Sequence, residues 1–315
     1  MKPRPRGRRS TPPGEHRAVM LAEVVAVLDP QPGHIVVDCT VGFGGHAVEL
    51  LQRVGPTGKL IGIDLDADNV PRARQRLEAV GHPFALHHGN FAGLPAILAA
   101  EGVDRCDCLL ADLGMSSLQL DEPSRGFSYT REGPLDMRMD TSRGRTGAQV
   151  LQTIAEHELA AALREYGDEP EAERIAAAIV ATRQREPITT TTALARVVSE
   201  ALQAGPWRLH PTPGKWNTHP AARTFQALRI LVNRELANLD ALLRQLPAVL
   251  RPGGVAAVIS FHSGEDRRVK AAFRDGQLAG AYREIAAEPV RPSWTEQTNN
   301  PRSRSAKLRW AKMGA

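Results

Sequence analysis

Short apolar runs and amphipathic stretches alternate along the first 112 residues of the chain. The apolar runs have the length of buried strands and span residues 35–38, 59–64, 84–88 and 106–112. The amphipathic stretches have helical spacing and span residues 17–28, about 45–53, 68–80 and 93–100. We expect Asp68 to cap the third of these helices with its side chain. The alternation predicts an α/β fold with a parallel sheet, whose ligands bind at the carboxyl ends of the strands.

The alternation stops near residue 121 and resumes near residue 221. Between these points we expect an aperiodic segment, helices and a proline-rich loop, at residues 121–147, 149–157, 158–166, 171–185, 192–203 and 205–220. The hydroxyls of Thr189–Thr192 are expected to cap the last helix. After the insertion we expect a long helix, a strand, a helix and a closing antiparallel pair, at residues 221–250, 255–260, 264–274 and 282–286 with 307–312. The predicted domains are an irregular basic tail, an α/β domain in two parts and a helical insertion, at residues 1–14, 15–125 with 218–315, and 126–217.

A glycine-rich turn follows the first strand. Residues 35–38 end in Asp38, and Gly42, Gly44 and Gly45 precede the next helix. Strand, glycine turn and helix form the first unit of a Rossmann-like nucleotide site, because glycine lets the backbone turn tightly and approach a ligand. A turn that only packs the helix against the strand is the alternative interpretation.

Two cofactors fit this outline. The turn matches the dinucleotide fingerprint G-x-G-x-x-A, and Asp64 follows at a distance suited to a ribose. Asp38, however, lies four residues before Gly42, where its carboxylate would repel the diphosphate of NAD. The same carboxylate would attract the ammonium and sulfonium groups of S-adenosylmethionine. Charge therefore favours S-adenosylmethionine over NAD.

Composition adds limits on location and metal chemistry. The 315-residue chain has no apolar run of 18 residues, so we expect no membrane span. The N-terminus lacks the apolar core of a signal peptide, which predicts a cytoplasmic protein. Cys39, Cys106 and Cys108 lie on or beside predicted strands and form no C-x-x-C pair. We expect buried thiols and no zinc site.

Positive charge is concentrated at the two ends of the chain. Residues 1–13 and residues 299–315 each carry five Lys or Arg and no acid. Because the net charge is +5, removing these ten cations leaves −5 for residues 14–298. Two basic ends suit a ligand with a phosphate backbone. A solvated tail without a ligand is an equal alternative for the first of them.

Several longer segments, taken together, resemble one family, the bacterial 16S ribosomal RNA cytosine-N4 methyltransferases (RsmH or MraW). The resemblance runs from about His16 to about Trp310, with departures at Arg17–Val19 and Gly264. Its most specific segments are Gly133–Asp140 (GPLDMRMD) and Phe261–Ser263. The other matching segments are Asp38–His46, Ile63–Asp66, Leu110–Asp121, Arg125–Tyr129, Arg223–Ile230, Ile259–Arg267 and Asn300–Ser305.

The resemblance implies an enzyme that uses S-adenosylmethionine to methylate N4 of a decoding-centre cytosine in 16S rRNA, within the small ribosomal subunit. It implies a class I methyltransferase fold, with a mostly parallel seven-stranded sheet and an inserted helical domain. The oligomeric state stays open. Carried over by motif, the cofactor contacts fall on Gly44, Gly45, His46, Asp64, Phe91, Asp112 and Gln119.

Three of these positions have a chemical rationale. A carboxylate at Asp64 can accept both ribose hydroxyls. Phe91 can pack on the adenine face, with core packing as the alternative. Asp112 ends the fourth strand, where methyl donor and acceptor should meet; it either stabilises the cationic donor, accepts a proton from N4 or caps a helix. Asp112 is therefore the candidate catalytic residue.

The mechanism expected is direct transfer without metal or covalent intermediate. The Asp/Asn-Pro-Pro-aromatic motif of many amino-group methyltransferases is absent, since Asp112 is followed by Leu113-Gly114-Met115. The cytosine amine is a poor nucleophile, so catalysis should rest on alignment and a proton acceptor. His262 either orients that acceptor or is structural.

RNA contacts are harder to assign. The target base must be splayed out of its RNA, and an aromatic side chain can stack on it. The stacking candidates are Phe127, Tyr129, Trp207 and Trp216, although for each of them core or interface packing is the favoured interpretation. The candidate phosphate contacts are Arg138, Arg223, Arg229, Arg302 and Arg304, although for each alone a solvated or ion-paired arginine is the favoured interpretation. A noncatalytic RNA-binding assembly factor and a nicotinamide oxidoreductase are the rival functions.

Overall fold

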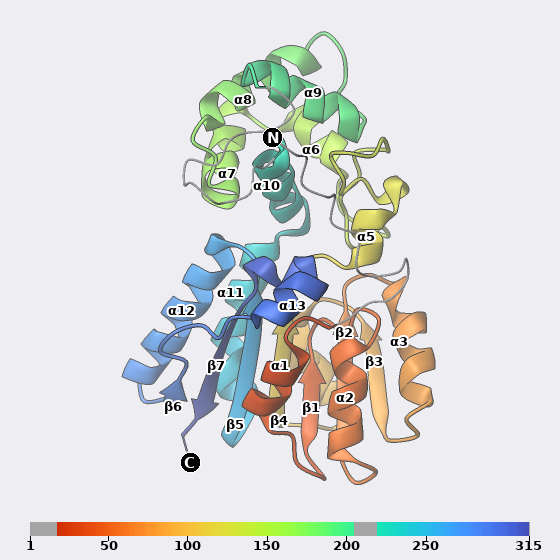
Figure 1. Cartoon of the computed structure of the whole chain (residues 1–315), viewed down its shortest axis with the longest axis vertical. Helices are drawn as coiled ribbons and strands as arrows, with labels where there is room; N and C mark the ends of the chain where they lie inside the picture. Colours follow the sequence, from red (N-terminus) through yellow and green to blue (C-terminus); the bar gives the residue numbers. More distant parts are fainter. Residues whose placement is uncertain (1–17, 205–218, 315) are drawn as a thin grey trace, which may run out of the picture. The chain divides into compact units, whose positions relative to one another are not determined.

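The computed structural model describes residues 18–204 and 219–314. The chain divides into two compact units (Figure 1). The first, here called the sheet unit, comprises Met1–Gly114 and Asn238–Ala315, and the second, the helical unit, comprises Met115–Ala237. The basic tail and the proline-rich loop with Trp207 and Trp216 lie outside the described residues.

A seven-stranded sheet forms the centre of the sheet unit. Its strands are β1 (Ile35–Asp38), β2 (Lys59–Asp64), β3 (Phe84–His88), β4 (Cys106–Asp112), β5 (Leu250–Ser260), β6 (Tyr282–Ile285) and β7 (Lys307–Met313). They follow the order β3-β2-β1-β4-β5-β7-β6, and β7 runs antiparallel to both of its neighbours. The other neighbouring pairs are parallel. This confirms the expected mostly parallel sheet of a class I methyltransferase, together with its antiparallel closing pair.

Helices flank this sheet because most of its strands are apolar on both faces. They are α1 (Leu21–Leu28), α2 (Gly45–Val54), α3 (Asn69–Glu78), α4 (Leu94–Ala100), α11 (Glu235–Val249), α12 (Ser263–Leu278) and α13 (Trp294–Asn299). One large apolar cluster joins α1 and α2 to the central strands, with Leu50, Leu60 and Leu110 fully buried. The core therefore lies between the strands and their helices, and the strand ends are left for polar groups.

The helical unit packs as pairs of neighbouring helices. Its helices are α5 (Ser117–Asp121), α6 (Gly147–Thr153), α7 (Glu156–Gly167), α8 (Ala172–Arg183), α9 (Thr191–Ala201) and α10 (Ala222–Asn233). α7 packs against α8 and α10, and α8 packs against α9. Gly167 allows the close approach of α7 to α10, because a Cβ there would lie 2.7 Å from the carbonyl oxygen of Arg223. The hydroxyl of Thr190 accepts a hydrogen bond from the amide of Ala193, which confirms the expected threonine cap of α9.

Three sequence-based expectations for individual elements were wrong. The long helix at 221–250 is two helices, because Arg234 adopts a left-handed conformation (φ 52°) that ends α10. Asp68 precedes α3 but makes no side-chain capping bond. β5 begins at Leu250 and not at Val255, with an irregular register opposite β4. Each miss is local and leaves the order of the elements unchanged.

Candidate cofactor and catalytic site

Three carboxylates stand at the carboxyl ends of adjacent strands in the sheet unit. Asp38 ends β1, Asp64 ends β2 and Asp112 ends β4. β1 pairs with both β2 and β4, so the three side chains meet at one edge of the sheet. We call this edge, with the turn that follows β1, the carboxyl edge.

The glycine turn joins β1 to α2 at this edge. Gly42 and Gly44 have φ of 53° and 80°, a left-handed backbone that side chains with a Cβ rarely adopt. Gly45 opens α2, and a Cβ there would lie 3.1 Å from the Cβ of Ala18. The glycines therefore give a tight turn and let the helix start against the preceding segment.

Asp64 is held by the turn that it faces. Its carboxylate accepts hydrogen bonds from the amide of Gly42 (2.7 Å), the amide of Asp66 (2.8 Å) and the side-chain amide of Asn69 (3.1 Å). Burial raises its pKa, and these three donors oppose the rise. Oδ1 already accepts two of these bonds, whereas Oδ2 accepts only the Gly42 amide and keeps a lone pair for a ligand hydroxyl.

Asp38 is almost fully buried (1% exposed). Its Oδ1 accepts a hydrogen bond from the amide of Thr40 (3.0 Å), while its Oδ2 is buried without a partner among the described residues. Burial raises its pKa to about 7, and the negative charge of Asp64 contributes to the rise. An orphaned buried carboxylate oxygen is costly, so this position suits a ligand that brings positive charge.

Asp112 and His46 face each other across the same edge. Burial lowers the pKa of His46 to about 4, so the ring is neutral at physiological pH. Its Nε2 lies 2.9 Å from the carbonyl oxygen of Val19 and must therefore carry the proton. Nδ1 then has only a lone pair to offer to Asp112 Oδ2, 3.7 Å away. The contact is consequently not an ion pair.

The pKa of Asp112 is raised well above its ordinary value. Burial is the main cause, and the charges of Asp38, Glu265 and Glu296 add to it. Its Oδ1 has no hydrogen-bond partner within the described part of the chain. The carboxyl edge thus gathers carboxyl groups whose ionisation is opposed by burial and by the charges of neighbouring acids.

Phe91 and Gln119 occupy different units. Phe91 is half-buried and opens a 3-10 turn directly after β3, whose start is capped by Asn90. Gln119 belongs to the helical unit, where it is buried and its Oε1 accepts a hydrogen bond from the amide of Ser116 (2.9 Å). Six of the seven expected cofactor contacts therefore lie in the sheet unit and Gln119 lies in the helical unit, and all seven remain predictions.

Two residues near the carboxyl edge were not singled out from the sequence. The hydroxyl of Thr40 accepts a hydrogen bond from the amide of Asp112 (2.7 Å) and so ties β1 to β4. Glu265 is buried, and its carboxylate accepts hydrogen bonds from the amides of Phe261 and His262. Nε2 of His262 lies 3.1 Å from the other oxygen of Glu265, but neither ring nitrogen has a hydrogen-bond partner among the described residues, so both interpretations of this histidine remain predictions.

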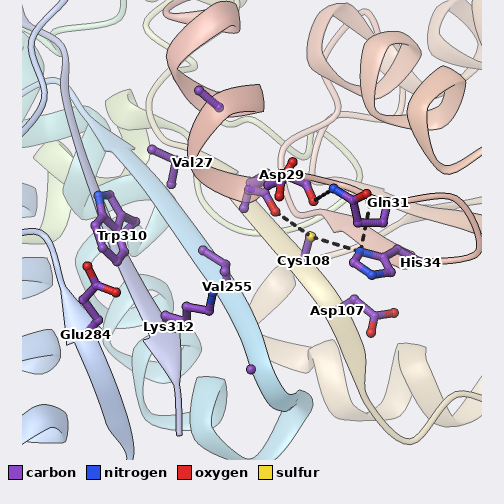
Figure 2. A pocket seen from close by; sticks show the side chains of 13 residues that line it. Val27, Asp29, Gln31, His34, Asp107, Cys108, Val255, Glu284, Trp310 and Lys312 are labelled. Atoms are coloured by element: carbon purple, nitrogen blue, oxygen red, sulfur yellow. Dashed lines mark hydrogen bonds between the residues drawn. The ribbon is translucent and has the colours of Figure 1, made fainter. Parts of the chain in front are cut away.

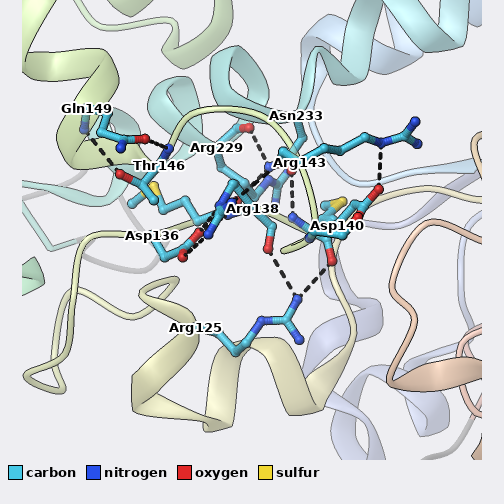
Figure 3. A network of polar contacts seen from close by, with 12 residues as sticks. Arg125, Asp136, Arg138, Asp140, Arg143, Thr146, Gln149, Arg229 and Asn233 are labelled. Carbon is cyan, nitrogen blue, oxygen red and sulfur yellow. Dashed lines mark hydrogen bonds and ion pairs between the residues drawn. The ribbon is translucent and has the colours of Figure 1, made fainter.

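The arginines of the helical unit are largely engaged within it (Figure 3). Arg138 forms a bidentate pair with Asp136 (both contacts 2.8 Å), and Arg229 forms one with Glu235 (2.9 and 3.0 Å). Arg125 donates to the carbonyl oxygen of Met139 (2.9 Å). The highly specific GPLDMRMD segment is thus a loop held by its own ion pairs, which favours a structural role for these arginines.

The aromatic candidates of the helical unit are also packed. Phe127 is buried, and Tyr129 stacks on His219 at 4.6 Å and meets Phe225 edge-on at 5.6 Å. Arg223 is half-buried and makes no ion pair with another described residue. It remains a candidate phosphate contact.

A cavity of about 380 Å³ opens at the end of the sheet opposite the carboxyl edge (Figure 2). The residues that line it include His34, Cys108, Trp310 and Lys312, near the start of β1 and the end of β7.

Cys39, Cys106 and Cys108 are all buried free thiols, as expected. The residues that the structure describes contain no cluster of ligands for a metal ion.

No helix within the described ranges is long and apolar enough to cross a membrane.

The profile described as the MraW methylase family matches residues 14–314 of the chain. The chain is 44% identical over 310 residues to the ribosomal RNA small subunit methyltransferase H of Sorangium cellulosum, covering 98% of this chain and 92% of the relative. It is 43% identical over 317 residues to the protein of the same name from Solidesulfovibrio magneticus, covering 94% of each.

Proposed function

Because the chain belongs to the MraW methylase family, we propose that it methylates N4 of a decoding-centre cytosine in small-subunit ribosomal RNA. The reaction uses S-adenosylmethionine, which supplies a methyl group on a positively charged sulfur. The names of the relatives, all ribosomal RNA small subunit methyltransferases, support the substrate class. Such an enzyme would act in the cytoplasm, where ribosomal subunits are assembled.

The observation that carries the proposal is the charge of the carboxyl edge. Burial raises the pKa values of Asp38, Asp64 and Asp112 there; the charge of Asp64 adds to the rise at Asp38, and the charge of Asp38 adds to the rise at Asp112. One carboxylate oxygen of Asp38 and one of Asp112 have no partner among the described residues. A cationic ligand lowers the cost of ionising these groups, whereas the diphosphate of NAD would increase it. The site therefore fits a sulfonium cofactor and not a dinucleotide.

The residues of the carboxyl edge suit distinct parts of that cofactor. We assign the ribose hydroxyls to Asp64, which its three backbone and side-chain donors hold in place. We assign the adenine to Phe91, whose half-buried ring begins the turn after β3. Gly44, Gly45 and His46 border the remaining space at the start of α2.

We assign the role of proton acceptor to Asp112. When the N4 lone pair forms its bond to the methyl carbon, the bond from that carbon to the cofactor's sulfur would break and leave its electron pair on sulfur. The nitrogen becomes positively charged and must lose a proton. Asp112 is partly exposed (22% of its side chain) and has an oxygen without a partner in the described ranges. A carboxylate whose pKa is raised accepts a proton more readily than an ordinary one. Nearby positive charge on the bound donor would keep it ionised until transfer occurs.

The test is transfer of labelled methyl groups to small subunits from cells that lack this enzyme, followed by mapping of the modified nucleotide. We expect label on one cytosine of the decoding centre, as N4-methylcytosine. Asp112→Asn should lower kcat by about 10²-fold or more, the usual contribution of a general base. Binding of subunits without transfer would instead support the noncatalytic assembly factor, and label on another nucleotide would refute the assigned substrate.

A further inference from the structure

Among the described residues of the sheet unit, one large aromatic side chain is exposed to solvent. Trp294 is 80% exposed, although tryptophan is normally well buried. It opens α13, a short helix that is firmly held. Ser293 caps the helix by accepting a hydrogen bond from the amide of Glu296 (3.1 Å), and Gln297 donates to the carbonyl oxygen of Pro292 (2.9 Å). The exposure of Trp294 is therefore a property of an ordered surface.

This surface borders the catalytic edge. Glu296 accepts a hydrogen bond from the amide of Met20 (2.7 Å), and the neighbouring Val19 carbonyl is the partner of His46. The charge of Glu296 also contributes to the raised pKa of Asp112. Figure 1 shows α13 at the end of the sheet where β4 terminates. A substrate that reaches Asp112 therefore passes close to α13.

The chain around Trp294 is basic. Residues 291–305 contain three exposed arginines, at positions 291, 302 and 304, and a single acid, Glu296. That acid is committed to the Met20 amide and is not exposed. The surface thus presents cations and an aromatic ring, with its one carboxylate turned inward. This combination matches a single-stranded nucleic acid, whose bases stack on aromatic rings while arginines attract its phosphates.

We propose that Trp294 is a stacking platform for an unpaired base of the ribosomal RNA that flanks the target cytosine. Arg291, Arg302 and Arg304 attract the adjoining phosphates. This inference rests on the proposed function, because it assumes an RNA substrate at the neighbouring carboxyl edge. It assigns the substrate strand to a surface of the sheet unit.

The test compares Trp294→Ala with a matched control, Leu278→Ala. Leu278 is equally exposed (81%) but ends α12, which starts at the carboxyl end of β5 and runs 16 residues away from it. Methyl transfer to small subunits is measured together with calorimetry of S-adenosylmethionine binding. We expect Trp294→Ala to raise KM for subunits by about 5- to 100-fold, as loss of one stacked base does. The affinity of Trp294→Ala for S-adenosylmethionine should equal that of the wild type. Trp294→Phe should have a KM for subunits close to the wild-type value, and Leu278→Ala should have the wild-type KM.

Ultraviolet cross-linking of the wild-type protein on the subunit identifies the partner. A Trp294 peptide joined to a nucleotide near the target cytosine is the expected product. A Trp294 peptide joined to a ribosomal protein, or an unchanged KM in Trp294→Ala, would overturn the inference while wild-type methyl transfer still supported the function. Failure of the wild type to methylate subunits would instead refute the proposed function itself.

Discussion

Asp38 shows how one buried side chain can favour a ligand at the cost of stability. Its pKa is about 7 in the folded protein and near 3.8 in an unfolded chain, so folding opposes its ionisation. The cost is absent below about pH 4, grows as the pH rises and is complete above about pH 7. A bound cation would recover part of this cost, so cofactor affinity should rise as Asp38 ionises.

We therefore predict opposite effects of Asp38→Asn on stability and on cofactor binding. At pH 8 the variant should be more stable than the wild type without cofactor, by up to roughly 4 kcal/mol, the cost that the raised pKa represents. Its affinity for S-adenosylmethionine should be lower and should lose the rise between pH 6 and 8. Thermal unfolding and calorimetry over this pH range measure both effects. If cofactor affinity depends on pH in the same way in the variant and in the wild type, Asp38 does not select the cofactor.

Asp64→Ala should weaken binding of S-adenosylmethionine by roughly 1.5–3 kcal/mol, the usual contribution of hydrogen bonds to a charged group. The substitution also leaves the amides of Gly42 and Asp66 without their acceptor, so stability should fall as well. Asp64→Asn is the control, since it keeps one acceptor oxygen for these amides. Calorimetry measures the affinity of both variants, and unchanged affinity in the alanine variant would remove Asp64 from the site.

An ion triad joins α12 to β7. Asp266 accepts from Arg309 (2.7 Å) and from Lys307 (2.6 Å), and Arg309 is only 4% exposed. Burial alone would raise the pKa of Asp266, but the hydrogen bonds from Arg309 and Lys307 outweigh it and lower the pKa. The triad therefore stabilises the packing of α12 against β7 above about pH 4.

Removing the charge of Asp266 leaves the buried guanidinium of Arg309 unpaired. We predict that Asp266→Asn lowers the free energy of unfolding at pH 7 by roughly 3 kcal/mol. The difference from the wild type should shrink as the pH falls through the lowered pKa of Asp266, because protonation removes the same charge. Asp275→Asn is a matched control on the same helix: its pair with Arg274 is exposed, so its loss should cost less than about 1 kcal/mol. Urea unfolding of the wild type and both variants measures these free energies. Equal losses of unfolding free energy in the two variants would contradict a buried triad.

The whole molecule separates its charges by region. Residues 14–298 carry a net −5, while each end carries five cations. An acidic body repels RNA except where basic segments approach it, so the ends should contribute to substrate binding mainly through long-range attraction.

Deleting residues 1–13 should therefore lower affinity for ribosomal RNA, and more at low salt than at high salt. Each lost phosphate contact reduces the slope of log affinity against log salt by about 0.7–0.9. Filter binding at several salt concentrations measures the slope, and a variant with the five cations replaced by Gln controls for length. If all three proteins share one slope, the tail does not bind RNA.

Prediction from the sequence succeeded where the signal is local and repeated. Strand periodicity identified β1 to β4, because apolar runs of this length have few alternatives, and the sequence shows an acid at the ends of β1, β2 and β4. It failed at Arg234, where one residue in a left-handed conformation divides a continuous helical pattern. It also missed Trp294, since an isolated tryptophan in a sequence is more often buried than exposed.

The sequence alone determined the alternating order of strands and helices, the glycine turn and the carboxylates at the strand ends, since these features follow from short-range periodicity and charge. Two properties required the folded molecule. Strand order brings Asp38, Asp64 and Asp112 to one edge, and burial there changes their protonation, because a pKa depends on neighbours that are distant in the sequence. Tertiary packing likewise leaves Trp294 exposed beside the carboxyl edge, whereas Arg138 and Arg229 pair with acids close to them in the sequence, Asp136 and Glu235.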